Sequence, residues 1–226
     1  MARAQDEAVG TVAARWFAGS PAGFEGKREE MEIATIRGRL DFIRQAERLK
    51  DVLRSGRSSG GRQESTAEHS WRLCLMAMLF QDGLVGLDPL RVLQLCVVHD
   101  LGEALGGDVP AIVRDAHPDK SARERRDLLQ LARSLDPAAR ERLLALWDEY
   151  EAAATPEARA VKALDKMETI LQHSQGDNPP DFDYGFNLTY GRDYAQHDEV
   201  LRALRTLVDE ATARRMAIPR ADSSSA

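Results

Sequence analysis

A short apolar run in the chain leads directly into an imidazole and two carboxylates. The run covers residues 93–98, and His99, Asp100 and Glu103 follow it. On a helix Glu103 lies one turn beyond His99 and Asp100, so the three side chains can converge on one edge. Unpaired charge is costly to bury, and a metal ion is one of the few partners that satisfies a His–Asp pair there. Taken alone, the pair also fits a core histidine held by a neighbouring acid.

Two further candidate ligands lie upstream and downstream of this run. His69 falls in the first turn of a helix that opens at residues 65–68 with the capping-box pattern Ser-Thr-Ala-Glu. Asp165 lies near the apolar edge of a later helical pattern. Two imidazoles and two carboxylates make a mixed nitrogen and oxygen set suited to a divalent first-row metal. Singly, His69 could stabilise a helix start, and Asp165 could pair with Arg159 or Lys162.

The elements that must position these groups are predicted to be helices. Apolar spacing, capping residues and prolines at helix starts place them at about residues 30–53, 66–82, 89–106, 119–135, 137–154, 156–174 and 198–215. Residues 176–190 are predicted to form an ordered loop. No strand pair or internal repeat is visible, so the sequence predicts an all-α fold in which His99 and Asp100 lie in the middle of a helix.

The composition limits the class of protein. A chain of 226 residues with 43% hydrophobic and 30% charged residues suits one globular domain. We expect an extension of uncertain order over residues 1–28, a domain over 29–215 and a polar tail over 216–226. The net charge of −6 argues against a general affinity for nucleic acid or anionic membrane.

Cysteine usage and apolar run lengths address the compartment. Cys74 and Cys96 each lie in an apolar run, which predicts buried free thiols in a reducing compartment. No apolar stretch approaches the roughly 20 residues that span a bilayer, and the first residues lack the apolar core of a signal peptide. The sequence therefore predicts a cytoplasmic protein.

The order His, His-Asp, Asp on separate helices resembles the HD-domain metal-dependent phosphohydrolases, and more narrowly their 5′-deoxynucleotidase branch. The resemblance runs from about residue 40 to residue 210 and includes residues 68–70, 99–103, 107–110, 146–151 and 164–168. It implies an HD-domain helical bundle that hydrolyses nucleoside monophosphates. It also implies one divalent metal ion (Mn, Co, Mg, Zn or Fe), held by His69, His99, Asp100 and Asp165.

The resemblance also implies roles for three residues outside the metal set. The catalytic acids of the branch match Glu103 and Asp108, and its phosphate-contacting arginine matches Arg54. The chemistry is consistent, since Glu103 can hold the attacking water and Asp108 can protonate the leaving 5′ oxygen. Arg54 offers a planar fork to phosphate oxygens. From the residues alone, a helix-end cation is the better explanation of Arg54. Glu103 could be a surface acid, although two neighbouring candidate ligands argue against this.

One position departs from the family pattern. Relatives carry a tryptophan near the sugar after the arginine, whereas this chain reads Arg54-Ser55-Gly56-Arg57. Sugar selectivity and the preference for monophosphates are therefore open. Arg57 and Arg62 are candidates for contacts with further phosphates, and either one could instead be a solvated loop cation.

Several other functions compete with this reading. Two-iron HD oxygenases need extra histidines before the last Asp, and this interval offers only His117. Hydrolases of guanosine tetraphosphate carry Glu-Asp where this chain has Glu103-Ala104. An HD-type nucleoside triphosphate hydrolase and a catalytically silent nucleotide-binding HD protein both remain, although the presence of Glu103 and Asp108 argues against silence. The expected partners are a small nucleotide and, from the resemblance, a second copy of the chain.

Overall fold

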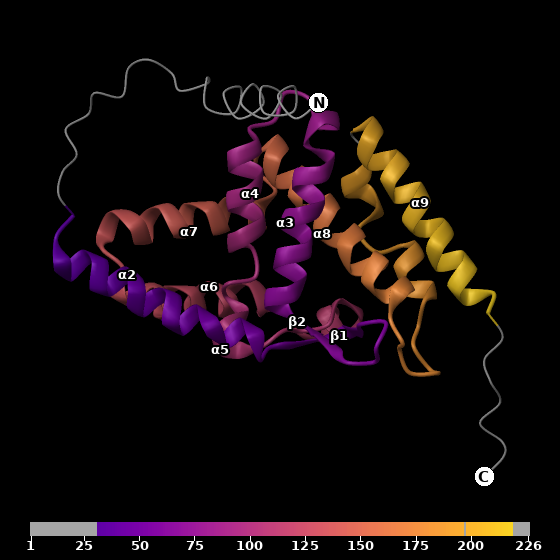
Figure 1. Cartoon of the computed structure of the whole chain (residues 1–226), viewed down its shortest axis with the longest axis horizontal. Coiled ribbons are helices and arrows are strands. Elements are labelled where there is room, and N and C mark those ends of the chain that lie inside the picture. Colours follow the sequence, from indigo (N-terminus) through magenta and orange to yellow (C-terminus); the bar gives the residue numbers. More distant parts are fainter. Residues whose placement is uncertain (1–30, 197, 219–226) are drawn as a thin grey trace, which may run out of the picture. The chain divides into compact units, whose positions relative to one another are not determined.

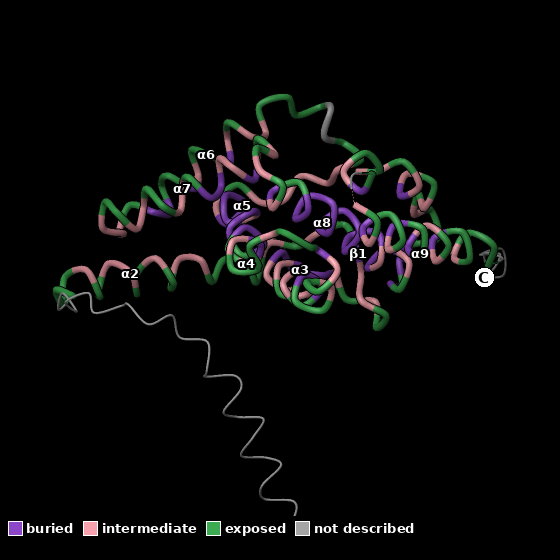
Figure 2. Tube along the Cα trace, turned by 90° about the horizontal axis from the view of Figure 1, so that it is seen from above, coloured by how far each residue is buried: buried purple, intermediate pink, exposed green. Residues whose placement is uncertain are grey.

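Helix α8 (Pro156–Gln175) is the central element of the fold (Figure 1). The computed structural model describes residues 31–196 and 198–218. Most residues of α8 are buried, as Figure 2 shows, and the helix packs against α3, α4, α7 and α9. The side chain of Thr155 caps its start by accepting from the backbone N–H of Ala158, and Pro156 occupies its first position. Asp165 therefore comes from the most enclosed helix of the described chain.

The other described elements are mostly helical, which confirms the predicted fold class. They are α2 (Ile33–Ala46), α3 (Thr66–Phe80), α4 (Pro89–Val98), α5 (Glu103–Gly106), α6 (Lys120–Leu131), α7 (Pro137–Ala152), α9 (Glu199–Met216) and two strands, β1 (Leu53–Arg57) and β2 (Gln63–Ser65). Short 3₁₀ turns occupy Glu47–Lys50, Gln81–Gly83, Ala111–Ala116, Ala132–Ser134, Gly185–Leu188 and Arg192–Ala195. Each predicted helix from residue 119 onward has a counterpart in the structure.

The capping box predicted at the start of α3 is confirmed. The Ser65 hydroxyl accepts from the backbone N–H of Glu68 at 3.3 Å, and the Glu68 carboxylate accepts from the backbone N–H of Ser65 at 2.9 Å. These two bonds satisfy donors that a helix start leaves free. They fix the point at which α3 begins, and so place His69 in its first turn.

The prediction of no strand pair is wrong. β1 and β2 pair antiparallel, with Leu53 opposite Ser65 and Arg57 opposite Gln63. The predicted helix over residues 30–53 therefore ends early: within the described chain α2 spans Ile33–Ala46, and Leu53 begins β1. Both strands are short, polar and irregular in register, so they lack the alternation by which strands are recognised. Arg54 accordingly projects from a strand and is not a helix-end cation.

The predicted continuous helix over residues 89–106 is also wrong. α4 ends at Val98, and His99 and Asp100 lie in a turn before α5. The turn closes through bonds of the 3₁₀ kind, such as Glu103 N–H to Asp100 C=O at 3.0 Å. Gly102 allows this turn to pack closely against α6, because a Cβ at position 102 would lie 2.7 Å from the backbone oxygen of Glu124.

Other expectations have mixed outcomes. α2 forms, but none of its residues is buried, so its apolar face is exposed. Cys96 is buried as predicted, whereas Cys74 is only half-buried and packs against the edge of the core. The extension over residues 1–28 and most of the tail lie outside the described residues, and the domain boundaries stay a prediction. No helix in the described ranges is both long and apolar enough to cross a bilayer.

Candidate metal centre

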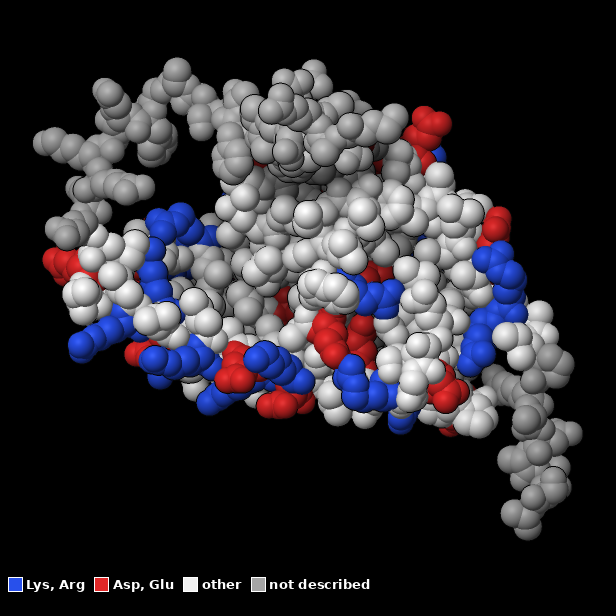
Figure 3. All heavy atoms as spheres, viewed as in Figure 1, with Lys and Arg blue, Asp and Glu red and all other residues white. Residues whose placement is uncertain are grey.

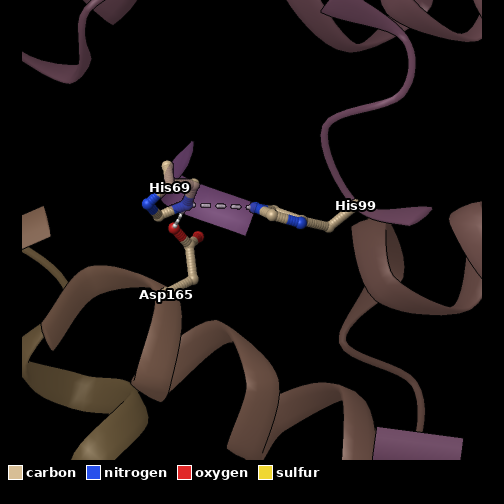
Figure 4. Close-up of side chains that lie close together, drawn as sticks. All are labelled: His69, His99 and Asp165. Atoms are coloured by element: carbon tan, nitrogen blue, oxygen red, sulfur yellow. Dashed lines mark hydrogen bonds and ion pairs between the residues drawn. The ribbon is translucent and has the colours of Figure 1, made fainter. Parts of the chain in front are cut away.

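Three of the four predicted ligands point toward one another between α3, the end of α4 and α8 (Figure 4). His69 Nε2 lies 3.3 Å from His99 Nε2 and 3.2 Å from Asp165 Oδ1. All three residues are buried, and His69 has no exposed surface at all. His69 and Asp165 are 96 residues apart in the chain, so only the packing of these helices brings the set together.

Each imidazole already has a partner at Nδ1. His69 Nδ1 contacts Glu168 Oε2, and His99 Nδ1 lies 2.9 Å from the backbone oxygen of Cys96. Since both partners are acceptors, both Nδ1 atoms carry the proton in the neutral rings, and both Nε2 atoms present a lone pair. Two lone pairs facing each other in a dry interior repel. A cation between them, either a proton or a metal ion, removes that conflict.

The ionisation of the centre points the same way. Burial and the charge of Arg54 lower the pKa of His69, but Glu168 and Asp165 outweigh them and raise it to about 10. Burial alone would raise the pKa of Asp165, yet Lys166 and the two histidines lower it well below its usual range. The Asp165 carboxylate is thus ionised, and the His69 imidazole is the group that carries the proton between the rings.

Asp100, the fourth predicted ligand, lies beside the other three. Its Oδ2 is 3.0 Å from His99 Nε2 and 3.8 Å from His69 Nε2. The same oxygen accepts from Arg54 at 3.2 Å. Two imidazole nitrogens and two carboxylates are a donor set that divalent first-row metals bind. A metal-bound histidine usually donates its other ring N–H to a carboxylate or a carbonyl, as both Nδ1 atoms do here. The residues therefore fit a divalent metal ion.

A cavity of about 460 Å³ opens onto this cluster. This volume suits a small ligand. The charged part of its lining includes His99, Asp100, Glu103, Asp108, Asp165, Lys120, Lys162 and Lys166, and an apolar part includes Val109, Pro110, Ile112, Val113, Phe182, Phe186 and Tyr190. Both predicted catalytic acids thus face the same space as three of the predicted ligands.

Glu103 is buried but not isolated. Its Oε2 accepts from the Thr66 hydroxyl at 3.3 Å, and its Oε1 lies 3.2 Å from Lys120 Nζ. Burial, followed by the charges of Asp100 and Asp108, raises the pKa of the Glu103 carboxyl well above its usual range. A buried carboxyl with a raised pKa that faces a cavity is a candidate for proton transfer.

The arginines predicted near the site differ in position. Arg54 lines the cavity and donates to Asp100 and, at 3.1 Å, to Thr169 Oγ1. Arg57 also lines the cavity, although its guanidinium donates to the backbone oxygen of Gly61 at 2.6 Å. The structure does not bring Arg62 there: its guanidinium is exposed and donates to both oxygens of Glu68, at 2.6 and 2.9 Å.

The sequence alone assigns no function to several residues that contact the cluster or Glu103. Glu168 lies three residues after Asp165, and an acid one turn from a ligand on the same helix was a usable signal. Tyr150 donates to Asp165 Oδ2 at 2.6 Å from another helix, α7. Lys120 reaches Glu103 from the start of α6. Neither of these two contacts has a local sequence signal, because each joins elements that only the fold brings together.

Comparisons with known proteins agree with this centre. A family model described as HD domain matches residues 46–205. The chain is 32% identical over 177 residues to "5'-deoxynucleotidase HDDC2" of Danio rerio, covering 76% of this chain and 86% of the relative. The protein of the same name from Homo sapiens is 36% identical over 141 residues, covering 62% and 68%.

A solved structure is similar as well. It is a predicted metal-dependent phosphohydrolase from Magnetospirillum magnetotacticum MS-1, with a TM-score of 0.66 and 29% identity over 81% of this chain and 97% of that one. The family and the buried cluster together indicate a divalent metal. Since the family model and the zebrafish relative each match most of the chain, this chain belongs to the HD domain family.

Proposed function

We propose that the protein is a metal-dependent phosphomonoesterase that removes the 5′-phosphate from deoxynucleoside monophosphates. The observation that carries the proposal is one cavity that three of the predicted ligands, His99, Asp100 and Asp165, share with Glu103 and Asp108. The names of the zebrafish and human relatives support the substrate class. The apolar lining of the same cavity offers a surface for the nucleoside part.

The roles in the reaction follow from where the side chains lie. A divalent ion at the cluster would stabilise charge on the phosphoryl oxygens and make a nearby water more acidic. Glu103, held by Thr66 and Lys120, would accept the proton of the attacking water. Asp108 would protonate the leaving 5′ oxygen, and Arg54 would orient the phosphate through its planar fork.

The donor set also narrows the metal. Two imidazoles favour Mn, Fe, Co or Zn over Mg, which prefers a shell of oxygen ligands and water. We therefore propose a first-row transition metal ion. The cavity position of Arg57 is the observation that favours the runner-up, a nucleoside triphosphate hydrolase, because a second arginine could meet further phosphates.

We also propose that the protein forms a homodimer and is located in the cytoplasm. Four large apolar side chains of α3, namely Trp71, Leu75, Met78 and Leu79, are 40–70% exposed and recur on one face of the helix. Where Figure 3 shows the described surface over α3 and α4, few charged side chains are visible. A contiguous apolar face supports a self-complementary contact with a second copy. Two free cysteines support a reducing compartment.

The metal assignment predicts the loss of metal from single variants. His99→Ala and Asp165→Ala should each bind far less than the roughly one divalent ion per chain expected for the wild type, because each removes a ligand. Affinity should also fall as the pH falls, since protons compete for the two Nε2 atoms. Elemental analysis after gel filtration is the measurement. Arg62→Ala, which lies away from the cluster, is the control, and equal metal content in all four proteins would contradict the assignment.

The substrate assignment predicts release of inorganic phosphate from deoxynucleoside 5′-monophosphates, with 3′-monophosphates hydrolysed poorly. A panel of mono-, di- and triphosphates with Mn, Co, Mg and Zn measures this, and Asp165→Ala serves as the blank. If triphosphates give tripolyphosphate and monophosphates stay intact, the runner-up activity is correct.

The two acids should separate from the ligands in their effects. Glu103→Gln should keep the metal and the fold while activity falls by roughly 10²–10⁴, as is typical when a general acid or base is removed. Asp108→Asn should slow the hydrolysis of alkyl phosphates most. It should slow the hydrolysis of activated aryl phosphates least, because their leaving groups need little protonation. Near-normal turnover of Glu103→Gln at full metal content would exclude the proposed base.

The dimer proposal is tested by solution mass. Light scattering should give twice the 25.1 kDa of one chain for the wild type. Leu79→Arg should give a monomer, because it places charge on the apolar face of α3. Leu207→Arg is the matched control, since Leu207 is similarly exposed but lies on α9. A monomeric wild type would rule the dimer out.

A further inference from the structure

We propose that Tyr150 and Lys166 are a pair of positioning residues that hold the Asp165 carboxylate with a single oxygen, Oδ1, offered to the two histidines. The inference rests on the metal site of the proposed function and adds to it two residues that the ligand set does not contain. It concerns how a ligand is presented, and therefore how tightly the metal is bound.

The two oxygens of Asp165 have different surroundings. Oδ2 accepts from the Tyr150 hydroxyl at 2.6 Å and from Lys166 Nζ at 2.5 Å. Oδ1 lies 3.2 Å from His69 Nε2, at the cluster. A carboxylate with both oxygens free can bind a metal through either or both. Two donors on Oδ2 leave Oδ1 as the ligand and fix the plane of the carboxylate.

Tyr150 is itself held in place by its ring. It is buried on α7, and its ring packs edge-on against the ring of His99, with the centroids 5.2 Å apart. The amino group of Lys162 lies 4.2 Å from the centroid of the same ring. A tyrosine fixed by these contacts can aim its hydroxyl at one oxygen, so the same side chain touches two of the predicted ligands.

Lys166 is held by contacts with the segment that contains Tyr190 and Gly191. Its Nζ lies 5.4 Å from the centroid of the Tyr190 ring. Gly191 has a φ of +63°, and a Cβ there would lie 2.3 Å from Lys166 Cγ. The stem of the lysine therefore occupies space that only a glycine at position 191 leaves open. The segment after Tyr190 thus acts on Asp165 through Lys166.

Because Lys166 is a cation, the direction in which its removal changes metal affinity distinguishes positioning from charge repulsion. A lysine cation beside the cluster repels a metal cation, so by electrostatics alone its removal should strengthen metal binding. If Lys166 positions Asp165, its removal should weaken binding, because the carboxylate is freed to turn. Positioning and simple charge repulsion therefore predict opposite changes in the dissociation constant.

The experiment measures Mn²⁺ and Co²⁺ dissociation constants of the full-length protein by competition with a chelating dye. Tyr150→Phe and Lys166→Met should each weaken binding by about 10–100-fold, the usual cost of losing a partner of a metal ligand. Lys166→Arg, which keeps a charged donor, should recover most of the affinity. Because both donors act on one oxygen, the double variant should lose less than the product of the two single losses.

Three further measurements separate positioning from damage to the fold. Lys50→Met removes a lysine that does not line the cavity and pairs only with the exposed Glu47, and it should leave affinity unchanged. Gly191→Ala should weaken binding with Lys166 still present, by displacing its stem. The visible absorption of the Co²⁺ protein, which reports ligand geometry, should change in Tyr150→Phe and Lys166→Met, while the melting temperatures without metal stay within a few degrees of wild type.

Two results would overturn the inference. The first is unchanged or tighter metal binding in Lys166→Met together with an unchanged Co²⁺ spectrum. The second is normal metal affinity with only a raised KM, which would make Lys166 a substrate contact. Either result leaves the proposed function standing if the wild type binds metal and releases phosphate. A wild type that binds no metal would end both.

Discussion

The rest of the centre depends on two imidazole nitrogens that face each other at 3.3 Å in a buried space. Glu168 and the Cys96 carbonyl take the other nitrogen of each ring, so neither imidazole can turn its N–H toward its neighbour. Such a contact is stable only with a cation between the rings. The capped start of α3 positions His69, and the turn after α4 positions His99, so that the two rings meet.

Each buried carboxylate around that point has its own cation. Asp100 pairs with Arg54, Glu103 with Lys120, Asp165 with Lys166 and Glu168 with Arg72, at distances of 2.5–3.2 Å. A buried charge without a partner would destabilise the fold by several kcal/mol. The pairs offset that cost, and with the exception of Lys166 the cations come from a different element than the carboxylate they meet. The charge of the site is thereby balanced by the fold as a whole.

The cluster of candidate ligands could be predicted from the sequence, while most of the contacts that hold it could not. His99, Asp100 and Asp165 stand out because polar residues interrupt apolar helical runs, and His69 follows a capping box. The strand that carries Arg54 has no alternating pattern, and the end of α4 at Val98 depends on how closely Gly102 approaches α6. The contacts of Tyr150 and Lys120 join separate helices, and Arg62 is diverted by Glu68 only six residues away. The first two contacts leave no local pattern to read, whereas the Arg62–Glu68 pair is close in sequence and is a signal that the sequence itself offers.

The charge pairs bear on the substrate as well as on stability. The chain has a net charge of −6, which by itself would repel an anionic ligand. Each of the four buried carboxylates has a cation beside it, and a divalent ion bound at the cluster would add positive charge to the site. A phosphate monoester carries close to two negative charges near neutral pH. A metal ion would therefore favour the binding of such a group, and it would couple substrate binding to metal binding through charge.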